Sequence, residues 1–128
     1  MFLFRLDVKS GVPVYRQLID QVMAALASGL LAEGDQLPTV RQAAVDLAIN
    51  LNTVVRAYRE LEIRGVLATQ QGIGTFITGK KIKISEIERQ RRLSQMAGEF
   101  LSRAATEGFT LGELVDYLRG LEPEAKRR

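Results

Sequence analysis

Residues 37–65 read LPTVRQAAVDLAINLNTVVRAYRELEIRG, a pattern that predicts two short helices joined by a tight turn. Thr39 and Gln42 stand three residues apart just before an apolar run, which is the spacing of a capping box. In such a box the Thr hydroxyl accepts a backbone N–H and the Gln side chain reaches back to the cap. The first helix is therefore expected to begin at Val40 and to end near Ala48.

The second helix is expected to begin after Asn50, a favourable N-cap, and to run over residues 51–64 until Gly65 ends it. Its buried stripe should consist of the apolar side chains that recur at helical spacing, namely Val54, Ala57, Tyr58 and Leu61. The residues left to face outward near its N-terminal half are Asn52, Thr53, Val55, Arg56 and Arg59. Short polar and basic side chains at the front of an exposed helix suit the reading of a DNA major groove, so the pair is interpreted as a helix-turn-helix.

A β-hairpin is predicted directly after these helices, with strands over residues 66–70 and 75–78 and a turn at 71–74. A hairpin in this place is the wing of a winged-helix domain. Gly72 lets the backbone approach closely, so the tip is expected to lie against the sugar–phosphate chain or in the minor groove. The alternative is an ordinary turn that needs glycine for its backbone conformation.

The motif NxNTVxRAYREL over residues 50–61 resembles the sequences of the YtrA-type branch of the GntR family of transcription regulators. The resemblance covers residues 13–77 well and the remainder in size and helix pattern only. It implies a mainly α fold, in which a winged helix-turn-helix DNA-binding domain with a small β wing is followed by a two-helix dimerisation tail. Other branches place arginines where this chain has Leu51 and Val55, so their base contacts are not carried over. Ala48 also departs from the family, which commonly has glycine in this turn.

The same resemblance implies a function. Such proteins are sequence-specific transcriptional regulators, here expected to be a repressor that binds an inverted-repeat operator in double-stranded DNA as a homodimer. They are often encoded beside transporter genes that they control, so a transporter operon is a candidate target. The alternative is a winged-helix protein-interaction module without specific DNA binding. Whether a small-molecule effector exists is left open.

The residues expected to bind DNA come from both helices and the wing. In GntR-type proteins the arginine that matches Arg41 contacts DNA, and a helix N-terminus independently favours a phosphate. Arg56 is expected to reach a phosphate, with guanine as the alternative. Asn52 is expected to pair with adenine or contact phosphate, unless it only satisfies backbone N–H groups, as Thr53 also could. The full expected set is Thr39, Arg41, Asn50, Asn52, Thr53, Arg56, Gln71 and Gly72.

An amphipathic helix is expected from Pro13 to a C-cap at Gly29, packed under the helix-turn-helix. Residues 2–6 fit a short strand or an arm, and residues 31–38 read as a loop. The expected core of the DNA-binding domain, residues 1–79, is Leu18, Ile19, Val22, Leu26, Leu47, Val54, Tyr58, Leu61 and Phe76.

The helical dimerisation tail is expected over residues 80–128, with helices at 86–107 and 111–121. Two helices of this size cannot bury both of their faces on one another, so the tail should need a partner. The simplest partner is a second copy of the chain.

Capping-box spacings predict where the tail helices begin, with Ser85 paired to Glu88 and Thr110 paired to Glu113. The apolar side chains on their faces are the expected dimer contacts. They are Ile87, Leu93, Met96, Phe100, Leu101, Leu111, Leu114, Val115 and Leu118.

The net charge of +3 is unevenly distributed. Residues 1–79 contain seven basic and seven acidic side chains, so the expected DNA-binding domain is neutral and the basic excess lies in residues 80–128. The DNA interpretation therefore depends on where a few arginines lie and not on bulk charge.

The composition, 46% apolar over 128 residues, is that of a folded chain with a hydrophobic core. Cysteine and histidine are absent, which excludes disulfides, Cys or His zinc sites and the usual general base. An enzyme, a cofactor or a metal is therefore not expected. Neither a membrane-spanning run of about 20 apolar residues nor a signal-peptide core occurs, so the chain is expected in the cytoplasm.

Overall fold

The structure of the protein, a computed structural model, describes residues 2–79 and 82–123. The chain divides into an N-terminal unit, Met1–Lys80, and a C-terminal unit, Lys81–Arg128. The boundary that the sequence predicts falls at Lys80, outside the described residues.

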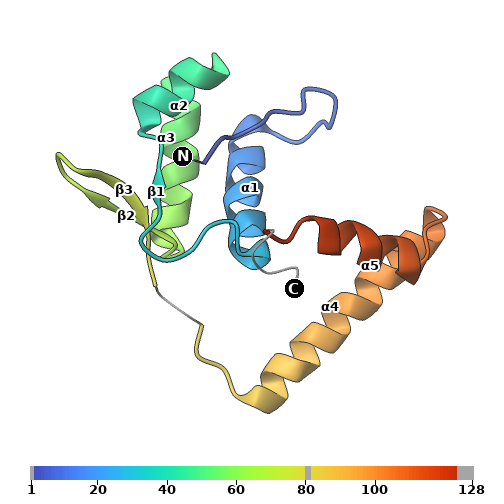
Figure 1. The fold of residues 1–128 in the computed structure, drawn as a ribbon. Coiled ribbons are helices and arrows are strands. Elements are labelled where there is room, and N and C mark those ends of the chain that lie inside the picture. Colours follow the sequence, from blue (N-terminus) through green and yellow to red (C-terminus); the bar gives the residue numbers. More distant parts are fainter. Residues whose placement is uncertain (1, 80–81, 124–128) are drawn as a thin grey trace. The chain divides into compact units, whose positions relative to one another are not determined.

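Three helices and a small sheet form the described part of the N-terminal unit (Figure 1). The helices are α1 (Val14–Ser28), α2 (Val40–Leu47) and α3 (Leu51–Ile63), and α1 packs along α3. Pro13 precedes α1, and Gly29 ends it in the left-handed conformation, with φ of 84°. The predicted helix-turn-helix is confirmed, with α3 one residue shorter than predicted.

Side-chain caps begin both helices of the pair. Thr39 Oγ1 accepts a hydrogen bond from the Gln42 backbone N–H at 3.1 Å, and Asn50 Oδ1 accepts one from the Asn52 N–H at 2.8 Å. The predicted return bond of the capping box is wrong, because the Gln42 side chain donates instead to Asp46 Oδ1 at 2.6 Å. Asp46 lies one turn further along the same helix, where its carboxylate accepts a charge-assisted bond from the Gln42 amide and holds that side chain away from the Thr39 N–H.

The turn between α2 and α3 holds Ala48 in the left-handed region, with φ of 54° and ψ of 46°. No other non-glycine residue in the described ranges has a positive φ. This conformation crowds the Ala Cβ against the following carbonyl oxygen and costs about 1–2 kcal/mol, which glycine avoids.

Replacing Ala48 with glycine should therefore stabilise the N-terminal unit by about 0.5–1 kcal/mol, because relief of the strain exceeds the entropy that glycine adds to the unfolded chain. Thermal unfolding should shift upward by about 2–8 °C. The matched control is Ala24→Gly on the exposed face of α1, which should destabilise by about 1 kcal/mol. A melting temperature that falls in both variants would contradict the strain.

The wing is a three-stranded antiparallel sheet with the order β1-β3-β2. Its strands are β1 (Gln36–Leu37), β2 (Leu67–Gln70) and β3 (Gly74–Ile77). The predicted hairpin is confirmed. The prediction of a loop over residues 31–38 is confirmed for residues 31–35 and 38 and is wrong for Gln36 and Leu37. Two residues of that segment pair with β3, Gln36 opposite Phe76 and Leu37 opposite Thr75.

The core of the N-terminal unit lies between α1, α2, α3 and the inner face of the sheet. Its fully buried members include Leu18, Ile19, Val22, Leu37, Val54 and Leu61. The prediction that Phe76 belongs to this core is wrong, because alternate residues of β3 face inward and these are Thr75 and Ile77. Tyr58 is buried as predicted; its hydroxyl donates to the Pro38 carbonyl at 2.6 Å, and burial raises the pKa of the phenol.

Residues 2–6 are neither strand nor helix. Of the two alternatives that the sequence left for this segment, a short strand or an arm, the structure therefore shows the arm. Two glutamines on successive turns of α1 hold its backbone. Gln21 Oε1 accepts from the Arg5 N–H at 2.8 Å, and Gln17 Oε1 accepts from the Asp7 N–H at 2.8 Å. Phe4 is thereby placed in the core.

Two helices, α4 (Glu86–Thr106) and α5 (Leu111–Gly120), form the described part of the C-terminal unit. The capping box at Thr110 and Glu113 is confirmed in both directions. At Ser85 only the side-chain cap forms, with the Glu88 N–H as donor, so the predicted box is wrong. The Glu88 carboxylate is bound instead by Arg91 and Arg92, which lower its pKa to about 2.

The C-terminal unit buries very little of its apolar surface within one chain. Ala104 is its only buried residue in the range 82–123. Ile87 is 85% exposed and Met96 65% exposed. Two half-buried side chains, Leu114 and Val115, complete the apolar faces of α4 and α5.

Candidate nucleic-acid interface

The two N-cap residues that were expected to bind DNA, Thr39 and Asn50, are exposed. Each uses its side-chain oxygen to accept a backbone N–H. A hydroxyl oxygen can accept one bond and still donate its own hydrogen, and an amide oxygen leaves the NH₂ group free. Both residues therefore retain donors for an anionic ligand at the start of α2 and α3.

Arg41 and Asn52 occupy the second position of α2 and α3, where backbone N–H groups and the helix dipole favour an anion. Both are exposed, and neither side chain makes a hydrogen bond or ion pair with any residue of the ranges 2–79 and 82–123. Arg64 differs, because it pairs with Glu60 at 3.3 Å. Thr53, also expected at the interface, is half-buried.

Arg56 lies against an aromatic ring. Its guanidinium carbon lies 3.7 Å from the centroid of the Tyr15 ring, which projects from α1. This distance is well inside the range of a cation–π contact. Tyr15 lies in the segment that was expected only to form an amphipathic helix packed under the helix-turn-helix, so the contact is a finding of the structure.

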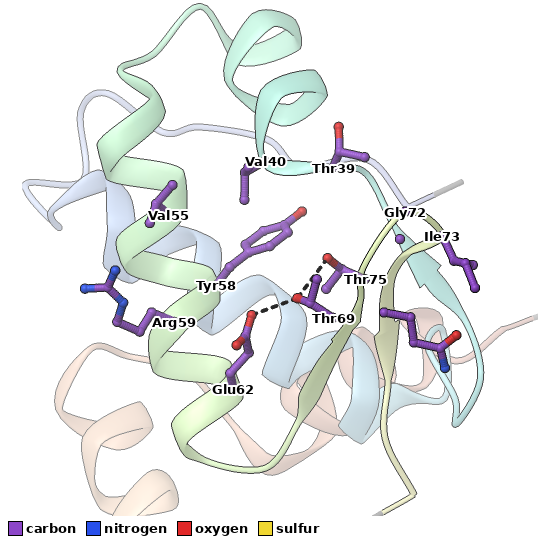
Figure 2. A pocket seen from close by; sticks show the side chains of 12 residues that line it. Thr39, Val40, Val55, Tyr58, Arg59, Glu62, Thr69, Gly72, Ile73 and Thr75 are labelled. Carbon is purple, nitrogen blue, oxygen red and sulfur yellow. Dashed lines mark hydrogen bonds between the residues drawn. The ribbon is translucent and has the colours of Figure 1, made fainter.

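A groove of about 550 Å³ separates α3 from the wing (Figure 2). Thr39, at the start of α2, and Gly72, at the tip of the hairpin, both line it. Glu62 on α3 accepts a hydrogen bond from the Thr69 hydroxyl at 2.9 Å, and Thr69 lies 3.4 Å from the Thr75 hydroxyl. These contacts connect α3 to both strands of the hairpin at the base of the groove.

Arg59 is a candidate that the sequence placed on the outward face without including it in the site. It lines the groove and makes no hydrogen bond or ion pair within the described part of the chain. Its spacing of three residues from Arg56 gave the available signal, since both fall on one side of α3. Its place in the lining of the groove depends on tertiary packing.

The tip of the wing is exposed at Gln71, Gly72 and Ile73. The Ile73 N–H donates to the Gln70 carbonyl at 2.9 Å and closes the turn, and Gly72 has φ of 79°. Glycine at this position avoids the steric cost of a left-handed residue. The Gln71 side chain has no partner among the described residues, so it remains free for a ligand.

A helix-turn-helix whose second helix is exposed beside a β wing defines the class of winged helix-turn-helix DNA-binding proteins. The family described as "Bacterial regulatory proteins, gntR family" matches residues 14–77. The chain belongs to this GntR family of DNA-binding transcriptional regulators.

Related proteins match nearly the whole chain. It is 30% identical over 125 residues to the HTH-type transcriptional repressor YtrA of Bacillus subtilis, covering 97% of this chain and 95% of that protein. It is 37% identical over 114 residues to the HTH-type transcriptional regulator Rv1152 of Mycobacterium tuberculosis, covering 89% of each. A crystal structure of a transcriptional antiterminator from Listeria monocytogenes matches with a TM-score of 0.64 and 28% identity, over 91% of this chain and 87% of that one.

These relatives agree with the YtrA-type resemblance that the sequence predicts. Among the described residues, no helix is both long enough and apolar enough to span a membrane. Within the same residues, acidic side chains do not cluster in a way that would hold a metal ion.

Proposed function

We propose that the protein is a transcriptional repressor that binds an inverted-repeat operator as a homodimer. Each winged helix occupies one half-site, and α4 and α5 hold the two copies together. The similarity to a protein named as a repressor, over nearly its full length, supports this direction of regulation. Membership of the YtrA-type branch extends the proposal to a transporter operon as the regulated target.

The unpartnered cationic and amide donors at the front of the helix-turn-helix carry the DNA-binding part of the proposal. Arg41 and Arg56 make no ion pair, and the Asn52 amide makes no side-chain hydrogen bond, in the described part of the chain. A phosphate supplies the missing acceptors, and a guanidinium binds it in a forked geometry. Thr39 and Asn50 add neutral donors, and Gln71 and Gly72 extend the contact from the wing.

The exposed apolar faces of α4 and α5 support the dimer. A large apolar surface is costly to leave in water, at roughly 25 cal/mol per Å². A second copy would cover it with an equivalent face in a two-fold arrangement. The contact residues proposed for this role are Ile87, Leu93, Met96, Phe100, Leu101, Leu111, Leu114, Val115 and Leu118.

Selection from a pool of duplexes with randomised inverted repeats tests the proposal as a whole. The protein should enrich one palindromic sequence whose half-sites are separated by roughly one DNA turn, about 34 Å. The logarithm of its affinity should fall linearly with the logarithm of NaCl concentration, with a slope steeper than about −3, because each of the two copies neutralises at least two phosphates, about four in all. Failure to enrich a palindrome, or a slope near zero, would reject it.

A further inference from the structure

The contact between Tyr15 and Arg56 joins the first helix of the unit to the proposed recognition helix. Tyr15 is half-buried and packs against the core, so its ring is held in place by the fold. Arg56 is exposed, and its guanidinium carbon lies 3.7 Å from the ring centroid. A long, otherwise mobile side chain thus rests on a fixed aromatic surface.

The contact leaves the hydrogen-bonding capacity of Arg56 unused. The ring face attracts the cation through its quadrupole and does not consume the N–H donors in conventional hydrogen bonds. None of these donors has an acceptor among the described residues. Arg56 is therefore both positioned and available.

The acidic residues that follow Arg56 on α3 have other partners. Glu60 lies four residues further along α3, the usual distance for an ion pair, but it binds Arg64 at 3.3 Å. Glu62 accepts from the Thr69 hydroxyl at 2.9 Å. Arg56 pairs with neither carboxylate, and the Tyr15 ring is the contact that sets the direction of its side chain.

We propose that Tyr15 is a positioning residue that holds Arg56 in readiness for a DNA phosphate; this inference rests on the proposed function. An arginine that is free in solution loses much of its rotamer freedom when it binds. An arginine already resting on Tyr15 has lost part of that freedom before DNA arrives. The benefit is pre-organisation, and Tyr15 needs no contact with DNA of its own.

Three substitutions of Tyr15 test this, with the selected palindromic duplex as the probe. Tyr15→Phe keeps the ring and should bind within about twofold of the parent. Tyr15→Leu and Tyr15→Met remove the ring and should each weaken binding by about two- to fivefold per subunit, the factor that corresponds to an exposed cation–π contact. Two ring-free variants are used because unbranched Met adapts to an irregular packing site more readily than branched Leu. Thermal melts show which of the two variants is folded.

A double-mutant cycle separates positioning from a general effect on the fold. In an Arg56→Gln background, loss of the ring should cause no further loss of affinity, because the side chain that it orients is gone. Equal losses in both backgrounds would overturn the inference, as would parental affinity in both ring-free variants. If neither ring-free variant folds, the test rests on Tyr15→Phe. A loss of affinity of more than twofold in that variant would show that the hydroxyl, and not the ring, supports binding, and would overturn the inference.

The outcomes also separate this inference from the proposed function. A parent protein that selects no duplex rejects the function and the inference together. If the parent binds and Arg56→Gln binds equally well, the function stands and only the role given to Arg56 and Tyr15 fails.

Discussion

Cutting the chain after Gly79 should leave a folded winged helix whose affinity for the operator is about 10²- to 10⁴-fold lower than that of the full chain. The fragment keeps the hydrophobic core of the N-terminal unit, which draws on α1, α2, α3 and the sheet. It should therefore melt cooperatively. Binding should weaken because the second half-site is no longer met at the roughly millimolar effective concentration that a dimer provides.

Two further proteins sharpen this experiment. In the full chain, Leu118→Asp puts a charge on the exposed apolar face of α5 and should reproduce the loss by separating the subunits. Joining two fragments through a flexible Gly/Ser linker of about 40 residues, whose mean span is close to 34 Å, should restore much of the affinity. Sedimentation gives the oligomeric state of each protein. A fragment that remains dimeric, or that binds the palindrome as tightly as the full chain, would remove α4 and α5 from the proposed dimer contact.

Arg41→Ala should weaken operator binding by about 1–3 kcal/mol per subunit while leaving stability unchanged or slightly increased. The two effects differ because a cation in the first turn of α2 is unfavourable to the helix dipole until an anion binds beside it. In the dimer the substitution occurs twice, so the loss of affinity should exceed tenfold. The slope of affinity against salt should also become shallower by about 1 for each phosphate that the variant no longer neutralises.

Arg64→Ala is the matched control for this experiment. Arg64 belongs to the same unit and is half-exposed like many surface arginines, but it is paired with Glu60 at the far end of α3. Its removal should leave both the affinity and the salt slope as in the parent. Parental binding by Arg41→Ala at physiological salt would show that the N-terminus of α2 does not contact the phosphate chain.

Local chemistry made much of the fold predictable. The side-chain caps at Thr39, Asn50 and Thr110 depend on residues two or three positions away, so sequence spacing alone located the starts of α2, α3 and α5. The glycines predicted to end helices, Gly29 and Gly65, likewise located the ends of α1 and α3. The strand and turn residues of 66–78 predicted the wing, and the family resemblance agreed with it.

Predictions failed where a tertiary contact or a competing partner decided the outcome. The two residues of β1 form a strand only because β3 lies beside them. Alternation in β3 was assigned to the wrong face, since sequence alone does not say which side of a short strand meets the core. At Glu88 the nearby cations Arg91 and Arg92 outcompete a backbone N–H for the carboxylate.

The candidate site shows the same division. Its exposed polar residues on α3 follow from helical periodicity, but the contact between Arg56 and Tyr15 joins residues far apart in the chain. That Arg59 lines the groove likewise depends on how the hairpin folds back. Neither arrangement leaves a signal in a single sequence.

The hydrogen bond that Thr69 donates to Glu62, and the one between the Thr69 and Thr75 hydroxyls, affect how the protein discriminates between DNA sequences. They brace the hairpin against α3, so the two elements approach a duplex as one piece with a fixed offset between them. DNA whose major and minor grooves already match that offset is bound without distortion, whereas other sequences must bend or change groove width at an energetic cost. Selectivity is then expected to extend to base pairs that no side chain touches.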